Sequence, residues 1–203
     1  IHSLEGNTED GNKEDPLCPG GNCPVPKVKV VSAMSWLFDN NRFVKDPKQV
    51  VLAQGDVVSL MVRLTNNGPL ETDTAETGEL LVHIPPGFEV IEDKTVRKST
   101  DATDFSFKKG DNGVTAVQIS FENIGPKGDQ RVVYIYLKAT GEEMSEGIVG
   151  LKGKLMKGQE IYTWPNADND NYVAYGPELI IENPRITNIF QSSVKVFSTD
   201  SVY

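Results

Sequence analysis

The chain has 203 residues, of which 38% are apolar and 24% are charged, and its formal net charge is −9. This length is enough to bury the core of one large or two small domains, and no apolar run is long enough for a transmembrane segment. The acidic balance and the lack of a basic stripe argue against nucleic acid as a partner, because contacts to phosphates require clustered Lys and Arg.

Residues 1–26 differ in composition from the rest of the chain. Residues 1–15 are mostly Gly, Asn, Glu, Asp and Lys, so we expect a flexible acidic arm with almost nothing to bury. The arm ends in a Pro- and Gly-rich loop that holds both cysteines of the chain, Cys18 and Cys23.

The two cysteines fit a disulfide better than a metal or redox centre. A zinc site would need His2 and His83 as further ligands, and these show no ligand spacing. A redox centre would need Cys-x-x-Cys, whereas four residues separate Cys18 from Cys23. We predict a local disulfide that closes the loop, and a disulfide between neighbouring subunits is the alternative. Either bond implies an oxidising compartment.

Residues 27–181 contain a series of strand patterns separated by turns. The clearest is residues 58–64, where four apolar side chains alternate with polar or mixed ones, as in a strand buried on one side. Residues 115–121 repeat this alternation, and residues 131–137 are apolar on both faces, as in a central strand. We expect the core to be built from these segments.

The segments between the strand patterns give no convincing helical signal. Residues 70–78 are acidic and Thr-rich, so we expect a loop there. Residues 92–104 form a polar stretch with Val96 as the one large apolar side chain. Short strands separated by turns predict an all-β fold, which we expect to be an antiparallel β-sandwich over residues 27–181.

Two neighbouring motifs carry a family resemblance. Gly55-Asp56 opens the strand of residues 58–64 and Asn66-Asn67-Gly68-Pro69 closes it, and a later strand ends in Pro85-Pro86-Gly87. This arrangement resembles the bacterial conserved-repeat domain of secreted surface proteins, an Ig-like module. The resemblance covers about residues 50–175 and implies an Ig-like sandwich at an extracellular or cell-surface location.

Residues 182–203 form a strand-like extension beyond the expected sandwich. Val194 and Val196 alternate with polar residues in this C-terminal tail. The tail would begin the next module in a tandem array, pack at an edge of its own sheet, or complete the sheet of a neighbouring subunit. For strand donation between subunits, the candidate assembly residues are Val28 and Val30 on the N-terminal side and Val194 and Val196 on the C-terminal side.

The sequence offers one candidate metal site and no catalytic one. Asp168 and Asp170, with Asn166 beside them, crowd oxygen ligands into one turn, which is what calcium prefers. An Asx-rich turn that bonds to its own backbone is the alternative. His83 has no evident orienting acid, so we expect no enzyme activity, and calcium is the only cofactor considered.

Two functions remain. The first is a non-enzymatic extracellular structural protein, a self-assembling filament or surface-appendage subunit whose copies are linked by strand donation. The alternative is an adhesin or carbohydrate-binding module at the cell surface. Such a module would use aromatic side chains as glycan contacts, and the candidates are Trp36, Tyr162, Trp164 and Tyr172.

Overall fold

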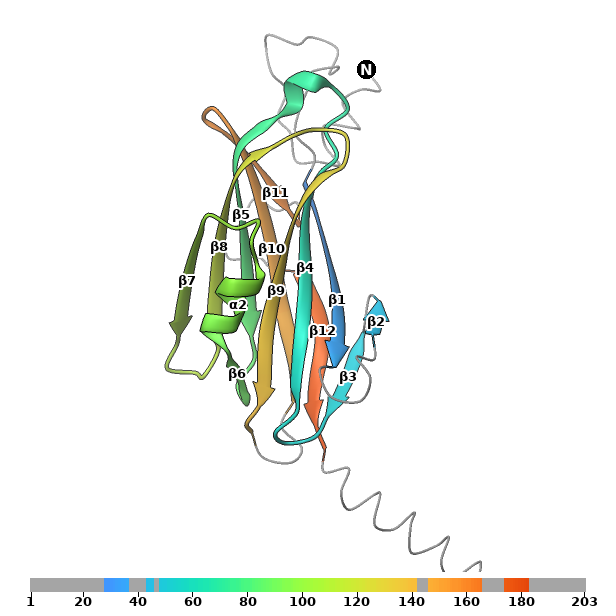
Figure 1. Cartoon of the computed structure of the whole chain (residues 1–203), viewed down its shortest axis with the longest axis vertical. Helices are drawn as coiled ribbons and strands as arrows, with labels where there is room; N and C mark the ends of the chain where they lie inside the picture. The colour runs from blue at the N-terminus through green and yellow to red at the C-terminus, as the bar shows by residue number, and fades with distance from the viewer. Residues whose placement is uncertain (1–27, 37–42, 46–47, 142–145, 166–173, 183–203) are drawn as a thin grey trace, which may run out of the picture.

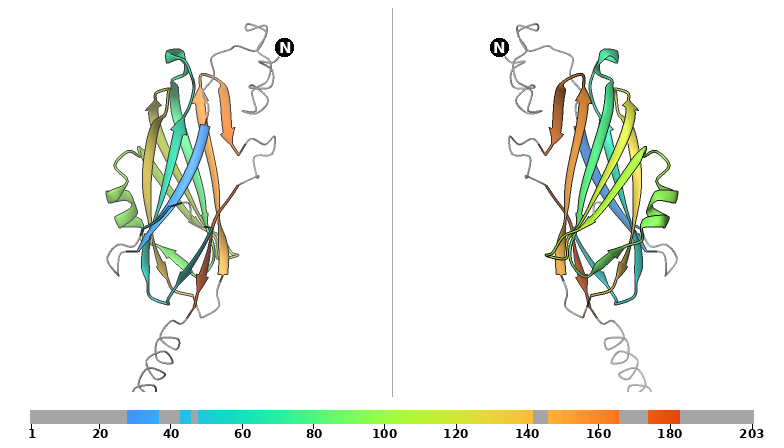
Figure 2. Two further views of the ribbon diagram at one scale, coloured as in Figure 1. Left: turned by 90° about the vertical axis from the view of Figure 1, so that its right-hand side faces the viewer. Right: turned by 90° about the vertical axis from the view of Figure 1, so that its left-hand side faces the viewer.

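The computed structural model describes residues 28–36, 43–45, 48–141, 146–165 and 174–182 (Figure 1). These residues form two sheets packed face to face, and a short helix lies outside one edge (Figure 2). The predicted all-β sandwich is confirmed. The elements are β1 (Val28–Trp36), β2 (Phe43–Lys45), β3 (Gln49–Leu52), β4 (Val57–Asn66), β5 (Ala75–Ile84), β6 (Phe88–Val90), α2 (Glu92–Lys98), β7 (Asp104–Lys109), β8 (Thr115–Ile124), β9 (Asp129–Ala139), β10 (Glu146–Lys157), β11 (Glu160–Trp164) and β12 (Ala174–Ile181). None of the helices in the described ranges is long and apolar enough to cross a membrane.

The two sheets have five and seven strands. The five-stranded sheet has the order β2-β1-β4-β9-β6, and the seven-stranded sheet has the order β3-β12-β10-β5-β8-β7, with β11 also paired to β10. The described pairs are antiparallel except for β3 and β12, which are parallel. Both β11 and β12 lie along one edge of β10, because Gly153 is opposite Trp164 and Leu151 is opposite Ala174. The chain therefore leaves this edge after β11 and returns to the same edge with β12.

The core lies between β4 and β9 of one sheet and β5, β8 and β10 of the other. The apolar row expected in residues 58–64 is fully buried, as are the rows that face it. Burial of each such side chain stabilises the fold by about 1.5–3 kcal/mol. The largest fully buried side chains are Leu52, Leu60, Leu64, Leu80, Ile84, Ile119, Phe121, Ile124, Ile135, Leu137 and Leu155.

Residues 92–104 show no helical periodicity, yet α2 occupies residues 92–98, so the expectation of no helix is wrong here. The helix lacks the apolar stripe that identifies most surface helices. Its one large apolar residue, Val96, is 45% exposed, whereas Thr95 and the following Ser99 are buried. The helix thus docks through small hydroxyl side chains. Its sequence therefore lacks the apolar periodicity by which surface helices are usually predicted.

The expectation of a loop over residues 70–78 is wrong in part. Residues 71–73 form a single 3-10 turn, and β5 already begins at Ala75. Gly78 sits on the inner face of β5, where a side chain would meet Ile124 Cδ1 at 2.8 Å and Leu64 Cδ2 at 3.0 Å. The side chains of Leu64 and Ile124 pack so closely here that position 78 must lack a Cβ. A glycine at an inward-facing position interrupts the apolar alternation by which a strand is predicted.

Candidate functional site

Most of the residues that the sequence singles out lie outside the described part of the chain. They are Cys18, Cys23, Asn166, Asp168, Asp170, Tyr172, Val194 and Val196. The disulfide, the calcium site and the donated C-terminal tail therefore stay predictions. Among the residues that the structure describes, no group of three or more His, Cys, Asp or Glu side chains is placed to hold a metal ion.

Val28 and Val30 belong to the sandwich of their own chain. They lie in β1, where Val28 is opposite Asn66 and Val30 is opposite Leu64 of β4. Val30 is only 4% exposed and is part of the core. This corrects their assignment to a donated tail, since a strand already paired in its own sheet is not available to another subunit.

Two of the four aromatic residues proposed as glycan contacts pack against the core. Tyr162 and Trp164 lie in β11 and pack, partly buried, against the core. Trp36 is the last residue of β1. A glycan platform needs an exposed aromatic face, so the packing of Tyr162 and Trp164 removes two of the four aromatic residues on which that reading depended.

His83 does not form part of a catalytic arrangement with Ser59. His83 lies between buried Val82 and Ile84 on β5, and Ser59 lies between buried Val58 and Leu60 on β4. Alternation therefore turns the two side chains toward opposite outer faces of the sandwich. Burial lowers the pKa of His83 below its usual value, which favours the neutral imidazole.

The outer edge of β9 is closed by side chains from α2 and the turn that follows it. Hydroxyl and carboxylate oxygens accept hydrogen bonds from three alternate backbone N–H groups of this edge. The bonds run from Tyr136 to Thr95 Oγ1 (3.0 Å), from Tyr134 to Ser99 Oγ (2.9 Å) and from Val132 to Asp101 Oδ2 (2.9 Å). Ser99 also donates its hydroxyl hydrogen to the carbonyl of Tyr134 at 3.4 Å.

The spacing of these bonds has a geometric basis. Four residues of an α-helix rise about 6 Å, and two residues of a strand advance about 6.7 Å. Thr95 and Ser99, four apart in and just after α2, therefore match Tyr136 and Tyr134, two apart in β9. Such a cover prevents another strand from pairing with the edge. The sequence signal for this cover is a pair of hydroxyl residues at a spacing of four, Thr95 and Ser99, which an apolar pattern does not include.

The upper part of the same side is closed by Arg131. Its Nη2 donates to the carbonyl of Asn123 at 2.5 Å and to that of Glu122 at 3.4 Å, which links β9 to β8 of the other sheet. Asp129 holds the same guanidinium through Nη1, with both carboxylate oxygens at 3.1 Å. This bridge joins the two sheets above α2.

The lower part of this side remains open and forms a groove of about 520 Å³, within the usual range for binding pockets. One wall is formed by β6 and the start of α2, and the other by β7 and the turn into β8 (Figure 1). The lining is mixed, with the aromatic ring of Phe107, three carboxylates and one ammonium group. Its charged members are Glu89, Glu92, Asp93 and Lys109.

The edge of β6 that faces away from β9 is unpaired within the described residues. The N–H of Ile91 bonds to the carbonyl of Tyr136 at 2.8 Å, and the N–H of Thr140 bonds to the carbonyl of Gly87 at 2.9 Å. In an antiparallel ladder, the backbone groups of alternate residues point to opposite sides. The N–H and C=O groups of Phe88 and Val90 therefore point away from β9, and no described strand pairs with them.

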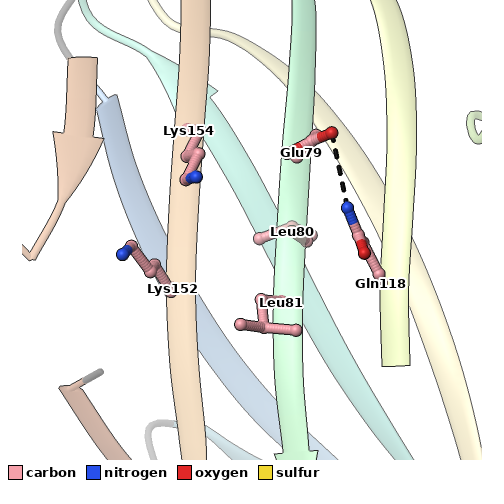
Figure 3. Close-up of a pocket in the computed structure, with 6 residues that line it drawn as sticks. All are labelled: Glu79, Leu80, Leu81, Gln118, Lys152 and Lys154. Atoms are coloured by element: carbon pink, nitrogen blue, oxygen red, sulfur yellow. Dashed lines mark hydrogen bonds between the residues drawn. The ribbon is translucent and has the colours of Figure 1, made fainter. Parts of the chain in front are cut away.

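A second, smaller hollow of about 210 Å³ lies on the outer face of the seven-stranded sheet (Figure 3). Gln118 Nε2 donates to Glu79 Oε1 at 3.5 Å, and Lys154 is opposite Glu79 in the register of β10 and β5. Lys152 is 3% exposed, and its side chain points away from Leu81 (Figure 3). The hollow offers charged groups of both signs on a sheet face.

No protein-family model matches the sequence, and no curated protein sequence matches it. The resemblance to the conserved-repeat domain therefore stays a prediction. Several solved structures are similar over part of the chain. Among them are a cohesin module of a family 33 glycoside hydrolase from Clostridium perfringens (14% identity, TM-score 0.36, covering 76% of this chain and 99% of that one), the cohesin of OlpA in a cohesin–dockerin complex from Clostridium thermocellum (16%, 0.34, 76% and 98%) and CaCohA2 from Clostridium acetobutylicum (13%, 0.34, 68% and 93%).

Proposed function

We propose that this chain is a non-enzymatic extracellular structural protein, a subunit of a self-assembling filament or surface appendage whose copies are joined by strand donation. The observation that carries the proposal is the contrast along one side of the sandwich. Arg131 and α2 close the upper and middle parts of this side, whereas β6 leaves a strand edge in a groove that no described strand pairs with. An open edge beside closed ones is where an added strand would pair.

The chemistry of the described residues supports a structural rather than a catalytic role. The larger hollow combines a strand edge with surface carboxylates, and the smaller hollow is a sheet face with a Glu–Gln hydrogen bond. Neither brings a nucleophile and a base together in the described residues, and His83 and Ser59 lie on opposite outer faces. Binding through backbone and charge is what these surfaces offer.

The proposal is tested by the mass of the protein in solution and by truncation. Sedimentation velocity of residues 1–203 over a hundredfold range of concentration should show concentration-dependent association, and electron microscopy should show ordered assemblies. Deleting residues 183–203 or residues 1–26 should leave a folded β-rich protein that associates less. A full chain that is monomeric at every concentration would contradict the proposal.

An adhesin or other surface-binding module is the second candidate. One observation favours it, which is a pair of exposed apolar side chains where β10 and β12 are paired. Tyr175 of β12 is 79% exposed and lies opposite Gly150, and the nearby Ile148 of β10 is 48% exposed. A monomeric protein that binds a glycan array, and whose binding is lost in Tyr175→Ala, would establish this function instead.

A further inference from the structure

We infer that the groove beside β6 receives residues 193–198 of a second copy of this chain. The inference rests on the proposed function and adds the acceptor, the donor segment and their register. It combines the unpaired edge of β6, the acidic lining of the groove and the pattern of residues in the C-terminal tail.

The acceptor is a short strand edge with a distinct pattern of side chains. Phe88 is buried, Glu89 is exposed and Val90 is partly buried, so the strand reads apolar, acidic, apolar. The backbone groups of Phe88 and Val90 face away from β9 and toward the groove. A segment added along this edge would extend the five-stranded sheet by one strand and bond to these groups.

The tail holds one segment with the complementary pattern. Val194-Lys195-Val196 reads apolar, basic, apolar. With Lys195 opposite Glu89, the two valines lie opposite Phe88 and Val90, whichever direction the strand takes. This register places opposite charges together on the exposed face and apolar side chains together on the inner face, and both kinds of cross-strand pair are favourable.

Charge favours the C-terminal tail over the N-terminal arm. The groove carries Glu89, Glu92 and Asp93 against the single Lys109. Residues 183–203 contain one Arg, one Lys and one Asp, for a net charge of +1, whereas residues 1–27 contain five acidic residues and two Lys, for −3. Complementary charge across a contact favours one partner and disfavours like-charged ones.

A second Val-Lys-Val segment occurs in the chain, and it is already paired. Val28-Lys29-Val30 lies in β1, where it is hydrogen-bonded to β4 of the same chain. The five-stranded sheet thus already contains a Val-Lys-Val segment, in the strand next to its β2 edge. Because it is used within its own sandwich, the C-terminal copy of the pattern is the one left for donation.

The position of the tail fits exchange between two copies. Glu182 follows β12 at the end of the sandwich where β6 also lies (Figure 1). Residues 183–192 separate it from the donated segment and span up to about 33 Å when extended. Because donor and acceptor lie at one end, the simplest product is a reciprocal two-fold pair. Growth into a filament then requires a second contact elsewhere on the molecule.

The test is a charge exchange in the full chain, followed by sedimentation velocity. Glu89→Lys alone and Lys195→Glu alone each place like charges at the contact, so the concentration for half-association should rise roughly tenfold or more. The double variant should restore association. An equimolar mixture of the two single variants should also restore it, because each groove then meets an oppositely charged tail only on the other variant.

Controls and contrary outcomes separate this inference from the proposed function. Glu122→Lys, an exposed carboxylate of β8 outside the groove, should associate as the unaltered chain does, and the milder Glu89→Gln should weaken association if Glu89→Lys does not fold. If the unaltered chain associates but the charge exchange has no effect, the inference is wrong and the proposed function stands. If association returns in the double variant but not in the mixture of the two single variants, the tail pairs with the groove of its own chain, and the inference is also wrong. A monomeric unaltered chain contradicts both.

Discussion

The side-chain amide of Asn66 donates a hydrogen bond of 3.2 Å to the backbone carbonyl of Ile124 and thereby joins the ends of β4 and β8, which belong to different sheets. The same amide nitrogen donates to the carbonyl of Asp73 at 2.9 Å, and Asn66 Oδ1 accepts from the N–H of Gly68 at 2.9 Å. Asn66 is fully buried. The Asn-x-Gly-Pro motif is therefore a structural tie between the sheets as well as a turn.

Replacing Asn66 should destabilise the protein strongly. Asn66→Asp removes both amide donors and leaves two buried carbonyls without them, at a cost of about 1–3 kcal/mol for each unsatisfied group. Chemical denaturation measures the loss in the free energy of unfolding. Asn67→Asp is the matched control, because Asn67 is exposed and should cost less than about 0.5 kcal/mol. Equal effects at the two positions would contradict the tie.

The cover of β9 by α2 predicts a second loss of stability. Thr95→Val keeps the shape of the side chain but removes the acceptor of the Tyr136 N–H, which is buried, so the free energy of unfolding should fall by about 1–3 kcal/mol. Thr103→Val is the control, since the bond from Thr103 Oγ1 to the carbonyl of Ser120 is exposed. Amide hydrogen exchange at Tyr136 should also become faster in Thr95→Val and stay unchanged in the control.

Gly153 should not tolerate a side chain. A Cβ at this position would lie 2.6 Å from Val30 Cγ2 and 2.9 Å from Leu64 Cδ1, where β10 passes under β1. Gly153→Ala should therefore cost about 1–3 kcal/mol in thermal or chemical unfolding. Val30→Ala makes room, so the cost of Gly153→Ala should shrink in that background. A full cost in both backgrounds would show that the contact with Val30 is not the cause.

His83 should contribute to the loss of stability on acidification. Burial lowers its pKa in the folded state below the usual value of about 6.5. Below that value, the unfolded chain binds a proton that the folded chain resists, so stability falls as the pH drops from about 7 through the lowered pKa. His83→Gln should flatten the thermal midpoint between pH 7 and pH 5, and His2→Gln should not. An unchanged slope in His83→Gln would contradict this.

The calcium prediction is tested by removal of the metal. If Asp168 and Asp170 bind calcium with Asn166, the bound ion stabilises the folded chain by mass action. Adding a chelator should then lower the thermal midpoint, and Asp168→Asn with Asp170→Asn should abolish the sensitivity. A melting curve that the chelator leaves unchanged would leave an ordinary Asx-rich turn.

The sequence by itself determined the layers of this fold. Successive side chains of a strand point to opposite faces of the sheet, so alternating apolar residues place one apolar row on one face. The apolar rows of β4, β5 and β8 are buried together in one core. The motif around Asn66 likewise marked the end of β4, because Pro fixes its own φ and Gly permits turn conformations that other residues avoid. These features depend on local geometry, which a sequence pattern records.

Only the tertiary structure decided what happens at the sheet edges. Helix α2 carries no apolar stripe, because Thr95 and Ser99 bond to β9 rather than pack against it. Val28 and Val30 could have belonged to a tail or a strand until β4 was seen to pair with them. The open edge of β6 also depends on where Arg131 and α2 stop covering that side. Edge pairing is a contact between segments far apart in the chain, so no local pattern specifies it.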